Sequence, residues 1–411
     1  MIRVLFIHQN LPGQFRRLIR HLQQTPGYEL TGIGEDKAIR REGFAAPFHA
    51  VSYAPPAGAG DKTHHYLKHF EACIRRGQEV VRKCLALKER GYRPDVIVCH
   101  PGWGEGLFLK DVFPEARLVM FCEFFWAADG LDVGFDPEYP ATLDDQLRIR
   151  IKNSVLLHAL LAADDGVTPT RWQHGVHPAE FRHKIHVVHE GIDTRVLVPD
   201  YAARVVLDDG TVLSRGQPVL TYVSRNLEPY RGFHVFMRAL PRILDANREV
   251  RVVIVGGDEV SYGRKPPAGL RSYREALMAE LGSRVDWSRV HFMGKVPYRT
   301  YVNILQVSSL HVYLTYPFVL SWSMLEAMAT GVPVLASATP PVQEVIRDGD
   351  NGFLFDFFDV DGLAARTLDL LARRHDIAAT GLRGRETVVR DYDFETVGLP
   401  IYLALLRPLS Q

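Results

Sequence analysis

Short apolar segments alternate with longer amphipathic segments along almost the whole chain, and this alternation restricts the fold more than any other feature. The apolar segments are RVLFIHQ, DVIVCH and RLVMFCE in the first half and PVLTYVSR, RVVIVGG, RVHFMG, HVYLTY and VPVLAS in the second. Segments with helical periodicity lie between them, at residues 15–24, 66–90, 146–163, 233–247 and 273–281. Strands that are apolar on both faces and alternate with helices are typical of parallel sheets built from βαβ units. The sequence therefore predicts an α/β fold.

The alternation stops once, between residues 191 and 216. The sequence there, GIDTRVLVPDYAARVVLDDGTVLSRG, lacks helical periodicity. Asp209 and Gly210 give a turn signal between RVVL and TVLS, which predicts a small hairpin. The second series of strands and helices starts at Pro218. We therefore predict two doubly wound domains, residues 1–198 and 217–388, joined by a linker and hairpin at 199–216. The carboxyl ends of their strands are expected to face a cleft.

Composition excludes several classes of protein. Lys and Arg total 49, Asp and Glu total 48, and this balance does not favour a nucleic-acid-binding protein that relies on positive charge. The four cysteines show no C-x-x-C spacing and are interpreted as reduced thiols. The first apolar run is too short for a signal peptide, and the longest one, residues 155–163, is far shorter than the roughly 20 residues that span a bilayer. We expect a cytoplasmic protein that at most touches a membrane surface.

Two arginines follow the predicted strand PVLTYV. Arg225 and Arg231 stand on either side of a loop, and a helix is expected to begin near Gly232. Guanidinium groups stay charged and offer forked donors, so this pair suits a diphosphate. The alternative is a surface ion pair of either arginine with Glu228. Gly294 ends another predicted strand, RVHFMG, where a flat base could lie against the backbone.

Two connections between a strand and a helix predict anion sites at helix N-termini. In HQNLPGQF, Gly13 opens the first helix, where unpaired N–H groups suit a phosphate or a sugar oxygen; a plain tight turn is the alternative. In YPFVLSWSMLEAMATG, Ser321 or Ser323 could cap a helix, and N–H groups near residues 320–324 could receive a phosphate. Glu326 is expected in the first turn of that helix, where the dipole favours a carboxylate. A carboxylate only accepts hydrogen bonds, so Glu326 could hold two vicinal hydroxyls, as on a ribose.

Aromatic and polar residues follow two strands of the first half. The candidates on the acceptor side are His100, Trp103 and Glu105 in CHPGWGEG, with Glu123 and Trp126 in CEFFWAADG. This mixture suits the recognition of a sugar or another acceptor. For His100 alone, a structural role is an equal alternative. Glu123 lies among phenylalanines, so its carboxylate needs a partner or a raised pKa.

At this point the chain resembles a known family. MLEAMATGVPVLAS followed by PVQEVIRDGDNGFLF resembles the donor-site signature of the retaining glycosyltransferases of family 4. HQNLPGQF, HEGID, the arginine pair, VVIVGGD and VHFMGKVPY add to the resemblance, which covers nearly the whole chain. It implies the GT-B fold, in which an N-terminal acceptor domain and a C-terminal nucleotide-sugar domain are both Rossmann-like. It also implies that a helix at 389–411 returns to the N-terminal domain.

The resemblance also implies roles for individual residues. The donor diphosphate and sugar would be held by Gly13, Arg225, Arg231, Leu320, Ser321, Trp322 and Ser323. Glu326 would bind the ribose, and Gly294, Lys295 and Val296 would lie beside the nucleobase. Arg225 and Arg231 would stabilise the leaving diphosphate.

Two positions depart from the family pattern. The first glutamate of the E-x7-E signature falls at Phe318, so Ser321, Trp322 and Ser323 become candidate sugar contacts. Glu123 stands where many members carry a histidine. It is a candidate catalytic residue that binds a sugar hydroxyl or the acceptor, or positions the attacking group.

We therefore predict transfer of a sugar with retention from a nucleoside diphosphate sugar, with UDP favoured, to an acceptor hydroxyl. The acceptor could belong to a glycan, a lipid-linked molecule or a protein, in bacterial glycan, envelope or glycoconjugate synthesis. No cofactor, metal or nucleic acid is expected, and the oligomeric state is open. The alternatives are a nucleotide-sugar epimerase or hydrolase on the same fold and a non-catalytic nucleotide-sugar-binding protein.

Some patterns have a simpler interpretation. DVD at 359–361 fits the metal-binding D-x-D pattern, but its place before GLAARTLDLL predicts a helix cap. His65 and His69 are expected on one helix face, and without further ligands they predict no zinc site.

Two basic segments keep two interpretations each. Residues 261–274, SYGRKPPAGLRSYR, form either a solvated loop or a mobile flap over the cleft. Arg16, Arg17 and Arg20 lie on a predicted helix whose apolar face suits a sheet. Contact of these arginines with a membrane surface is the alternative.

Overall fold

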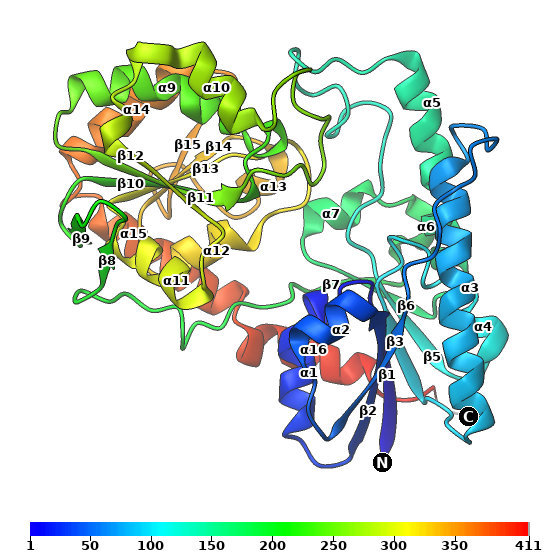
Figure 1. The fold of residues 1–411 in the computed structure, drawn as a ribbon. Helices are drawn as coiled ribbons and strands as arrows, with labels where there is room; N and C mark the ends of the chain where they lie inside the picture. Colours follow the sequence, from blue (N-terminus) through cyan, green and yellow to red (C-terminus); the bar gives the residue numbers. More distant parts are fainter. Residues whose placement is uncertain (410–411) are drawn as a thin grey trace. The chain divides into compact units, whose positions relative to one another are not determined.

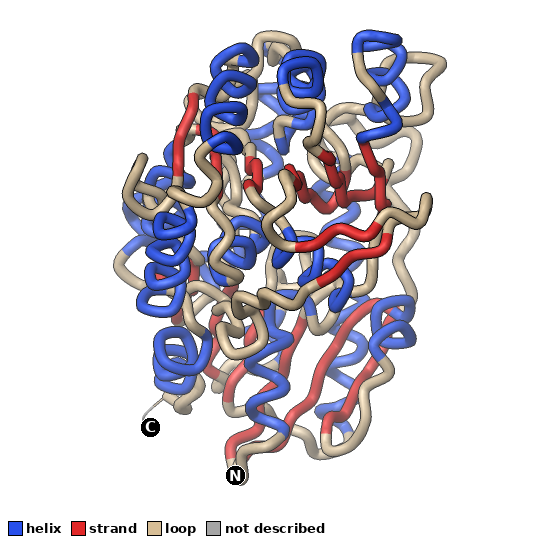
Figure 2. Tube along the Cα trace, turned by 90° about the vertical axis from the view of Figure 1, so that its left-hand side faces the viewer, coloured by secondary structure: helices blue, strands red, loops and turns tan. Residues whose placement is uncertain are grey.

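A computed structural model describes residues 1–409 and divides the chain into two compact units. Unit 1 comprises Met1–Gly191 and the chain from Phe394 onward, and unit 2 comprises Ile192–Asp393. Each unit contains a parallel sheet between layers of helices (Figures 1 and 2). The chain enters unit 2 at Ile192 and not after residue 198. Ile192 pairs with Asp393, and the guanidinium of Arg385 donates to the carbonyl oxygens of Thr194 and Leu197.

Unit 1 is built on seven parallel strands in the order β3-β2-β1-β4-β5-β6-β7. Their bounds are β1 Ile2–Ile7, β2 Tyr28–Glu35, β3 Phe48–Tyr53, β4 Val96–Cys99, β5 Arg117–Phe121, β6 Asp165–Thr168 and β7 Ile185–Val187. The strand order reverses between β1 and β4. In open α/β sheets, ligands bind at the carboxyl ends of the strands beside such a reversal.

Alternate residues of these strands face two helical layers. Val4, Phe6, Val98 and Phe121 pack with α1 (Arg16–Gln23) and with α16 (Leu399–Leu405). Leu5, Ile7, Ile97 and Met120 pack with α3 (Lys68–Glu89), α4 (Leu109–Val112) and α6 (Ser154–Ala162). The remaining helices of the unit are α2 Asp36–Glu42, α5 Leu143–Lys152, α7 Arg171–Val176 and α8 Ala179–Arg182. Burial of both faces explains why the strand sequences are almost wholly apolar.

The end of the chain belongs to unit 1. α15 (Ala378–Asp391) continues past residue 388 in unit 2, so the predicted start of the returning helix at 389 differs from the structure. The chain re-enters unit 1 at Phe394, passes through a π-helical turn, Phe394–Gly398, and forms α16. The guanidinium of Arg117 on β5 donates to the carbonyl oxygen of Arg407 at 3.0 Å, which ties the end of α16 to the sheet.

Unit 2 is built on six parallel strands in the order β12-β11-β10-β13-β14-β15, and its order reverses between β10 and β13. The bounds are β10 Val219–Asn226, β11 Arg251–Gly257, β12 Val290–Gly294, β13 Leu310–Tyr313, β14 Val334–Ser337 and β15 Phe353–Phe355. The helices α9 Phe233–Ala246, α10 Tyr273–Leu281 and α14 Val360–Ala372 cover one face (Figure 1). The helices α11 Tyr298–Val307, α12 Trp322–Ala329 and α15 cover the other, and α13 (Pro340–Gln343) follows β14.

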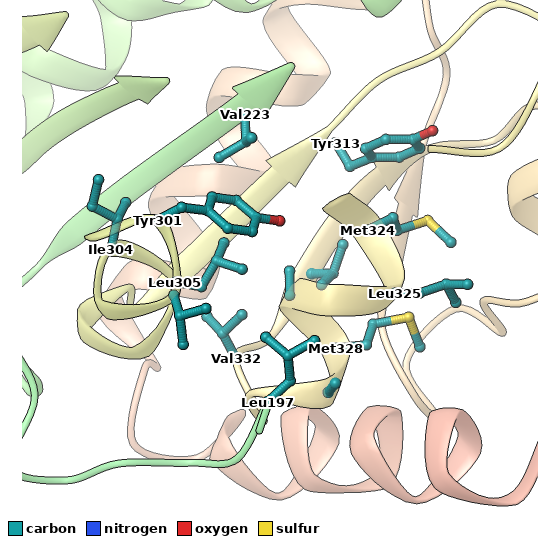
Figure 3. Packing of buried hydrophobic residues seen from close by; sticks show 14 of the residues in the cluster. Leu197, Val223, Tyr301, Ile304, Leu305, Tyr313, Met324, Leu325, Met328 and Val332 are labelled. Atoms are coloured by element: carbon teal, nitrogen blue, oxygen red, sulfur yellow. The ribbon is translucent and has the colours of Figure 1, made fainter. Parts of the chain in front are cut away.

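The core of unit 2 lies between the sheet and the pair α11 and α12. Ile304 and Leu305 of α11, Met324 and Met328 of α12, and Val332 belong to this one cluster, and all are nearly free of solvent (Figure 3). Beside this core, β8 (Arg204–Val206) and β9 (Val212–Ser214) pair as an antiparallel hairpin. The tight connection of this hairpin contains Gly210, whose φ of 82° is accessible to glycine. The turn signal of the sequence lies at that connection.

The eight strands named from the sequence all form, whereas β2, β3, β6, β7 and β15 were not predicted. β2 contains Gly32 and Gly34, which weaken a strand pattern, but a Cβ atom at Gly32 would lie 2.4 Å from the ring of Phe48. The helix predicted at 146–163 is divided at Asn153 into α5 and α6. α3 begins at Lys68, so the expectation that His65 and His69 share a helix face is wrong. Across the described residues, no helix combines the length and apolar character needed to cross a bilayer.

Candidate functional site

In unit 1, four polar side chains lie in a row at the carboxyl ends of β1, β4 and β5, and two hydrogen bonds join three of them. Nε2 of His8 lies 2.7 Å from Oε1 of Gln14, and the amide of Gln14 donates to Oε1 of Glu123 at 2.8 Å. Nε2 of His100 lies 3.4 Å from Oε2 of Glu123. The structure therefore brings His100 and Glu123 together beside the strand reversal, and it adds His8 and Gln14, which were not among the predicted site residues.

The backbone assigns the tautomer of both histidines in this row. The N–H of Asn10 donates to Nδ1 of His8 at 2.8 Å, and the N–H of Gly102 donates to Nδ1 of His100 at 3.2 Å. Each Nδ1 is therefore an acceptor, so in the neutral ring Nε2 carries the proton. Nε2 of His8 then donates to Gln14, whereas Nε2 of His100 lies near Glu123 without forming a hydrogen bond in the described residues.

Glu123 is the acceptor on which the row converges. Burial by itself would raise the pKa of Glu123, but the neighbouring His100 imidazole and the hydrogen bond from Gln14 outweigh it and lower the pKa below its usual value. The sequence left two possibilities for a carboxylate among phenylalanines, a raised pKa or polar partners. The structure supplies polar partners. The amide of Gln173 on α7 donates to the Glu123 carbonyl oxygen at 2.7 Å and fixes the backbone. An ionised carboxylate held in this way can accept a proton from, or bind, a hydroxyl.

Gly13 packs against this row at the start of a helical segment. It begins a short 3₁₀ turn, Gly13–Phe15, that runs directly into α1 at Arg16, so Gly13 opens the helical segment as predicted but lies outside the α-helix itself. Gly13 has a φ of +50°, and a Cβ atom there would lie 2.4 Å from Nε2 of His8. Glycine at this position lets the turn approach the imidazole.

Trp103 and Trp126 have different surroundings. The Trp103 ring stacks on His100, with 4.7 Å between centroids. The Trp126 ring carries the ammonium group of Lys152 at 3.4 Å from its centroid, and Asn153 holds the Trp126 backbone with hydrogen bonds of 2.7 and 3.2 Å. Burial lowers the pKa of Lys152 to about 8. Trp103 therefore belongs to the row, whereas one face of Trp126 is occupied by a cation.

Glu105, two residues after Trp103, is buried. It is 1% exposed; the Tyr53 hydroxyl donates to Oε1 at 3.1 Å, and Nε of Arg76 lies 3.7 Å away. Arg76 also donates to Glu35 at 3.1 Å and to the carbonyl oxygen of Trp103 at 3.2 Å. Burial raises the pKa of Glu105 to about 7. These contacts indicate that Glu105 supports the loop and does not line the row.

This burial predicts a pH effect on stability. The pKa of the Glu105 carboxyl rises from 4.5 in the unfolded chain to about 7 in the folded protein. Between these two pH values the folded protein keeps the proton and the unfolded chain has lost it. Stability is therefore expected to fall as the pH rises through this window, by on the order of 3 kcal/mol. In Glu105→Gln, thermal unfolding followed from about pH 4.5 to about pH 7.5 should lack this fall. The exposed Glu115→Gln variant should follow the wild type, and an unchanged pH profile in Glu105→Gln would contradict the assignment.

In unit 2, the two predicted arginines differ in exposure. Arg225 is exposed and, within residues 1–409, its side chain forms no hydrogen bond or ion pair. Arg231 is 8% exposed, and Nη1 donates to Thr315 Oγ1 at 2.7 Å and to the Val319 carbonyl oxygen at 2.9 Å. Burial would lower the pKa of Arg231, but the phenol oxygens of Tyr313 and Tyr262 and the Glu228 carboxylate outweigh it, so the guanidinium stays charged. Neither arginine forms the surface ion pair with Glu228 that was the alternative.

Phe318 takes part in an aromatic cluster. Its ring lies 4.9 Å from Tyr262 and 5.5 Å from Tyr230, measured between centroids, and it is 4% exposed. Arg231 lies 5.8 Å from the same ring. The position that would carry an acid in the family pattern is therefore apolar and buried in this chain, beside a cation.

The loop at 261–274 is fixed at two places. Oε1 and Oε2 of Glu228 accept from the backbone N–H groups of residues 261–263, and the hydroxyl of Tyr273 donates to the carbonyl oxygens of Arg264 and Lys265 at 3.0 and 3.3 Å. Tyr273 lies at the start of α10 and is 4% exposed. The structure therefore holds an anchored loop where the sequence allowed either a solvated loop or a mobile flap.

Of the two serines that could cap α12, Ser321 is the cap. Its Oγ accepts from the N–H of Ser323 at 3.3 Å, while its own N–H donates to the Tyr313 hydroxyl at 2.9 Å. Two of the N–H groups expected to meet a phosphate are thus used inside the protein. Leu320 is 4% exposed, whereas Trp322 is half-buried at the first helical position.

Glu326 lies one turn further along α12 than expected. The helix begins at Trp322 and its first turn holds no acid, so placing Glu326 in that turn was wrong. Its carboxylate is 6% exposed and accepts from the hydroxyls of Tyr298 at 3.1 Å and Tyr301 at 2.7 Å, one on each oxygen. Figure 3 shows the Tyr301 hydroxyl pointing toward α12. A carboxylate offers about four lone-pair positions, so this type of group can accept from more than one hydroxyl.

The segment after β12 leads directly to these tyrosines. Gly294 ends the strand with a φ of 62°, and the exposed Lys295 donates to Glu259 Oε2 at 2.8 Å. Val296 packs against the core of unit 2. Tyr298 and Tyr301 follow at the start of α11, so the segment predicted to lie beside a base is joined to the Glu326 carboxylate. A tyrosine pair spaced i, i+3 was the sequence signal for these donors.

Asp359 caps α14, and its Oδ1 accepts from the N–H of Gly362 at 2.7 Å. The cap predicted for DVD is therefore confirmed.

Two parts of the chain match models of known protein families. The family model described as glycosyl transferase family 4 group matches residues 27–197, and the model described as glycosyl transferases group 1 matches residues 217–373. D-inositol 3-phosphate glycosyltransferase of Nocardia farcinica is 30% identical over 204 residues, which are 49% of this chain and 43% of that protein. GDP-mannose-dependent alpha-(1-6)-phosphatidylinositol monomannoside mannosyltransferase of Mycolicibacterium smegmatis is 29% identical over 212 residues, 51% and 52% of the two chains. This chain spans about half the length of these curated relatives.

Solved structures share the fold over nearly the whole chain. Sucrose-phosphate synthase of Thermosynechococcus elongatus has a TM-score of 0.72 at 16% identity, over 98% of both chains. Anabaena HepE in complex with UDP-glucose has a TM-score of 0.67 at 16% identity, over 98% of this chain and 99% of that one. The prediction of two Rossmann-like parallel-sheet domains is thus confirmed.

Proposed function

We propose a function from one premise, that this chain belongs to the family 4 glycosyltransferases and has their GT-B fold. In this proposal it transfers a sugar from a nucleoside diphosphate sugar to an acceptor hydroxyl, with retention and without a cofactor. The observation that carries the proposal is the buried Glu326 carboxylate, which two tyrosine hydroxyls hold in the same unit as the buried cation Arg231. A carboxylate can accept hydrogen bonds from the two hydroxyls of a ribose, and a fixed positive charge can bind a diphosphate. Together these groups suit a nucleoside diphosphate.

Unit 2 is the proposed donor-binding unit. Glu326 would accept the ribose hydroxyls, residues Gly294, Lys295 and Val296 would flank the base, and Arg225 and Arg231 would hold the diphosphate. The cations would also stabilise the negative charge that develops on the leaving diphosphate, so they supply charge neutralisation without a metal. Trp322 and Ser323 are proposed contacts of the sugar. The M. smegmatis relative is named for GDP-mannose, and the Anabaena structure contains UDP-glucose. We favour UDP as the donor nucleotide, and GDP is the alternative to test beside it.

Unit 1 is the proposed acceptor-binding unit. The row His8–Gln14–Glu123–His100 offers an ionised carboxylate beside two imidazoles and the ring of Trp103, a combination that suits a hydroxyl-rich molecule. The curated relatives are named for inositol phosphate and phosphatidylinositol mannoside, which supports a polyol or lipid-linked acceptor.

We also propose a cytoplasmic location with peripheral membrane contact. Arg16 pairs with Glu42, which leaves Arg20 as the exposed arginine of α1 for such contact.

A panel of nucleotides and nucleotide sugars tests the donor assignment. A ligand that binds only the folded state raises the stability by about 2.7 kcal/mol at a concentration of 100 times its Kd. Thermal unfolding should therefore shift upward with either UDP or GDP and their sugars, and not with adenosine. If no nucleoside diphosphate shifts the transition, the proposed function is wrong.

Arg225 allows a test without a stability effect. Because the side chain is exposed and makes no contact in the described part of the chain, Arg225→Ala should leave the melting temperature unchanged. It should weaken the bound nucleoside diphosphate about tenfold and nucleoside monophosphate much less, as measured by calorimetry. Equal affinity of Arg225→Ala and wild type for the diphosphate would remove Arg225 from the site.

The rival functions differ in what they release. An epimerase or hydrolase would convert the donor without any acceptor, and a binding protein would bind it without turnover. The apolar Phe318 in place of an acid favours keeping the binding protein as the second candidate. Nucleoside diphosphate release that rises on adding a polyol acceptor would exclude both.

A further inference from the structure

One buried carboxylate anchors the turn that follows β11. Oε1 of Glu228 accepts from the N–H of Ser261, and Oε2 accepts from those of Tyr262 and Gly263, each at 3.1 Å. Glu228 itself is 1% exposed. Three successive N–H groups that converge on one anion form a nest, and hydrogen bonds to a charged acceptor are stronger than neutral ones. The position of this turn therefore depends on the charge of Glu228.

The anchored turn places an aromatic ring against the buried arginine. The Tyr262 ring centroid lies 5.6 Å from Cζ of Arg231 and 4.9 Å from the centroid of Phe318. Tyr262 is 40% exposed, so the contact is made by part of the ring while the rest reaches solvent. A guanidinium within about 6 Å of a ring centroid is attracted by the ring. Tyr262 thus lies against Arg231, and the Phe318 ring centroid also lies 5.8 Å from Cζ of Arg231.

Arg231 is held at one of its three nitrogens. In the described part of the chain, every hydrogen bond of its side chain starts at Nη1, which donates to Tyr313, Thr315 and Val319. The ring contacts with Tyr262 and Phe318 restrict the plane of the guanidinium. Nε and Nη2 then have fixed directions and their N–H groups are available to an anionic ligand.

We propose that Glu228 is a positioning residue for the donor diphosphate, which acts through the turn 261–263 by holding Tyr262 against Arg231. This inference rests on the proposed function, because it assigns Arg231 to the diphosphate. It adds two residues to the site, Glu228 and Tyr262, that the sequence did not indicate. Changes at Glu228 or Tyr262 should weaken binding of the diphosphate group, and binding of the base and the ribose should stay unchanged.

The test compares Glu228→Gln with Tyr262→Ala and Tyr262→Phe, using UDP, GDP and the matching monophosphates as probes in calorimetry. Glutamine keeps the size of Glu228 but turns an NH2 group toward a backbone N–H. Glu228→Gln and Tyr262→Ala should each weaken the diphosphate about tenfold, while the monophosphate changes less than about twofold. Tyr262→Phe keeps the ring and should match the wild type, as should the exposed control Glu249→Gln. The double variant Glu228→Gln/Tyr262→Ala should be no weaker than Tyr262→Ala alone, because both act through one contact.

Each outcome has a distinct meaning. If the wild type binds neither diphosphate, the proposed function fails. If the wild type binds one and Glu228→Gln binds it equally well, or if the two losses add, the role of Glu228 is overturned while the proposed function stands. A Glu228→Gln protein that loses diphosphate and monophosphate alike would also overturn it, since that pattern reports a general loss of structure. Amide hydrogen exchange at residues 261–263 should become faster in Glu228→Gln, and unchanged exchange would refute the anchor itself.

Discussion

Glu326→Gln is expected to weaken binding of the nucleoside diphosphate about a hundredfold and to remove the preference for ribose over 2′-deoxyribose. Both carboxylate oxygens already accept a tyrosine hydroxyl, and the proposal assigns the ribose hydroxyls to the same carboxylate. An amide offers one accepting oxygen, so one tyrosine hydroxyl or one ribose hydroxyl meets an NH2 group. Hydrogen bonds to a charged group contribute about 1.5–3 kcal/mol each, which accounts for the size of the loss. Calorimetry with UDP, GDP and their 2′-deoxy forms measures it.

Two variants separate this effect from a change in folding. Glu386→Gln lies exposed on α15 and should bind as the wild type does. Tyr298→Phe removes one hydroxyl donor that is half exposed, so it should lower affinity only slightly and keep the preference for ribose. A Glu326→Gln protein that still discriminates ribose from 2′-deoxyribose by the wild-type factor would refute the ribose assignment, even if its overall affinity fell.

The sequence predicted the fold well because parallel sheets require apolar residues on both faces of each strand. RVVIVGG and PVLTYV carry that pattern without interruption, and both form central strands, β11 and β10. β2 did not carry it, because Gly32 and Gly34 interrupt the apolar run. These glycines are required by packing against Phe48 and Leu11, which come from other parts of the chain. Contacts of that kind cannot be seen in a local pattern.

The candidate site was predicted less completely, for a similar reason. Local signals located Arg231, Ser321 and Glu326, each next to a strand end or a helix start. The partners that define their chemistry come from distant segments: Tyr298 and Tyr301 for Glu326, and Tyr262 for Arg231. The error over the helical turn of Glu326 arose because either serine could have been the cap, and the choice of Ser321 fixes the register.

Glu123 shows how a distant partner decides chemistry. From the sequence, a carboxylate among phenylalanines could have been neutral with a raised pKa or ionised with partners. Gln14, more than a hundred residues away, and His100 settle this in favour of the ionised form. An ionised Glu123 can accept a hydrogen bond from an acceptor hydroxyl, whereas a neutral one would donate.

Glu123→Gln is therefore expected to reduce sugar transfer by about a hundredfold or more while leaving the donor affinity within about twofold, since the donor is assigned to unit 2. Glutamine fits the same space, and Gln173 still fixes the backbone, but one of the two neighbours, Gln14 or His100, then meets an NH2 group in place of a charged oxygen. The measurement is release of nucleoside diphosphate from the donor, in water and with polyol acceptors, beside calorimetry of the diphosphate. Glu115→Gln, exposed in the same unit, should transfer at the wild-type rate.

If Glu123→Gln transfers as fast as the wild type, the row at the carboxyl ends of β1, β4 and β5 is structural, and the acceptor must be bound elsewhere. If it loses donor affinity as strongly as transfer, Glu123 contributes to donor binding and the division of roles between the two units is wrong.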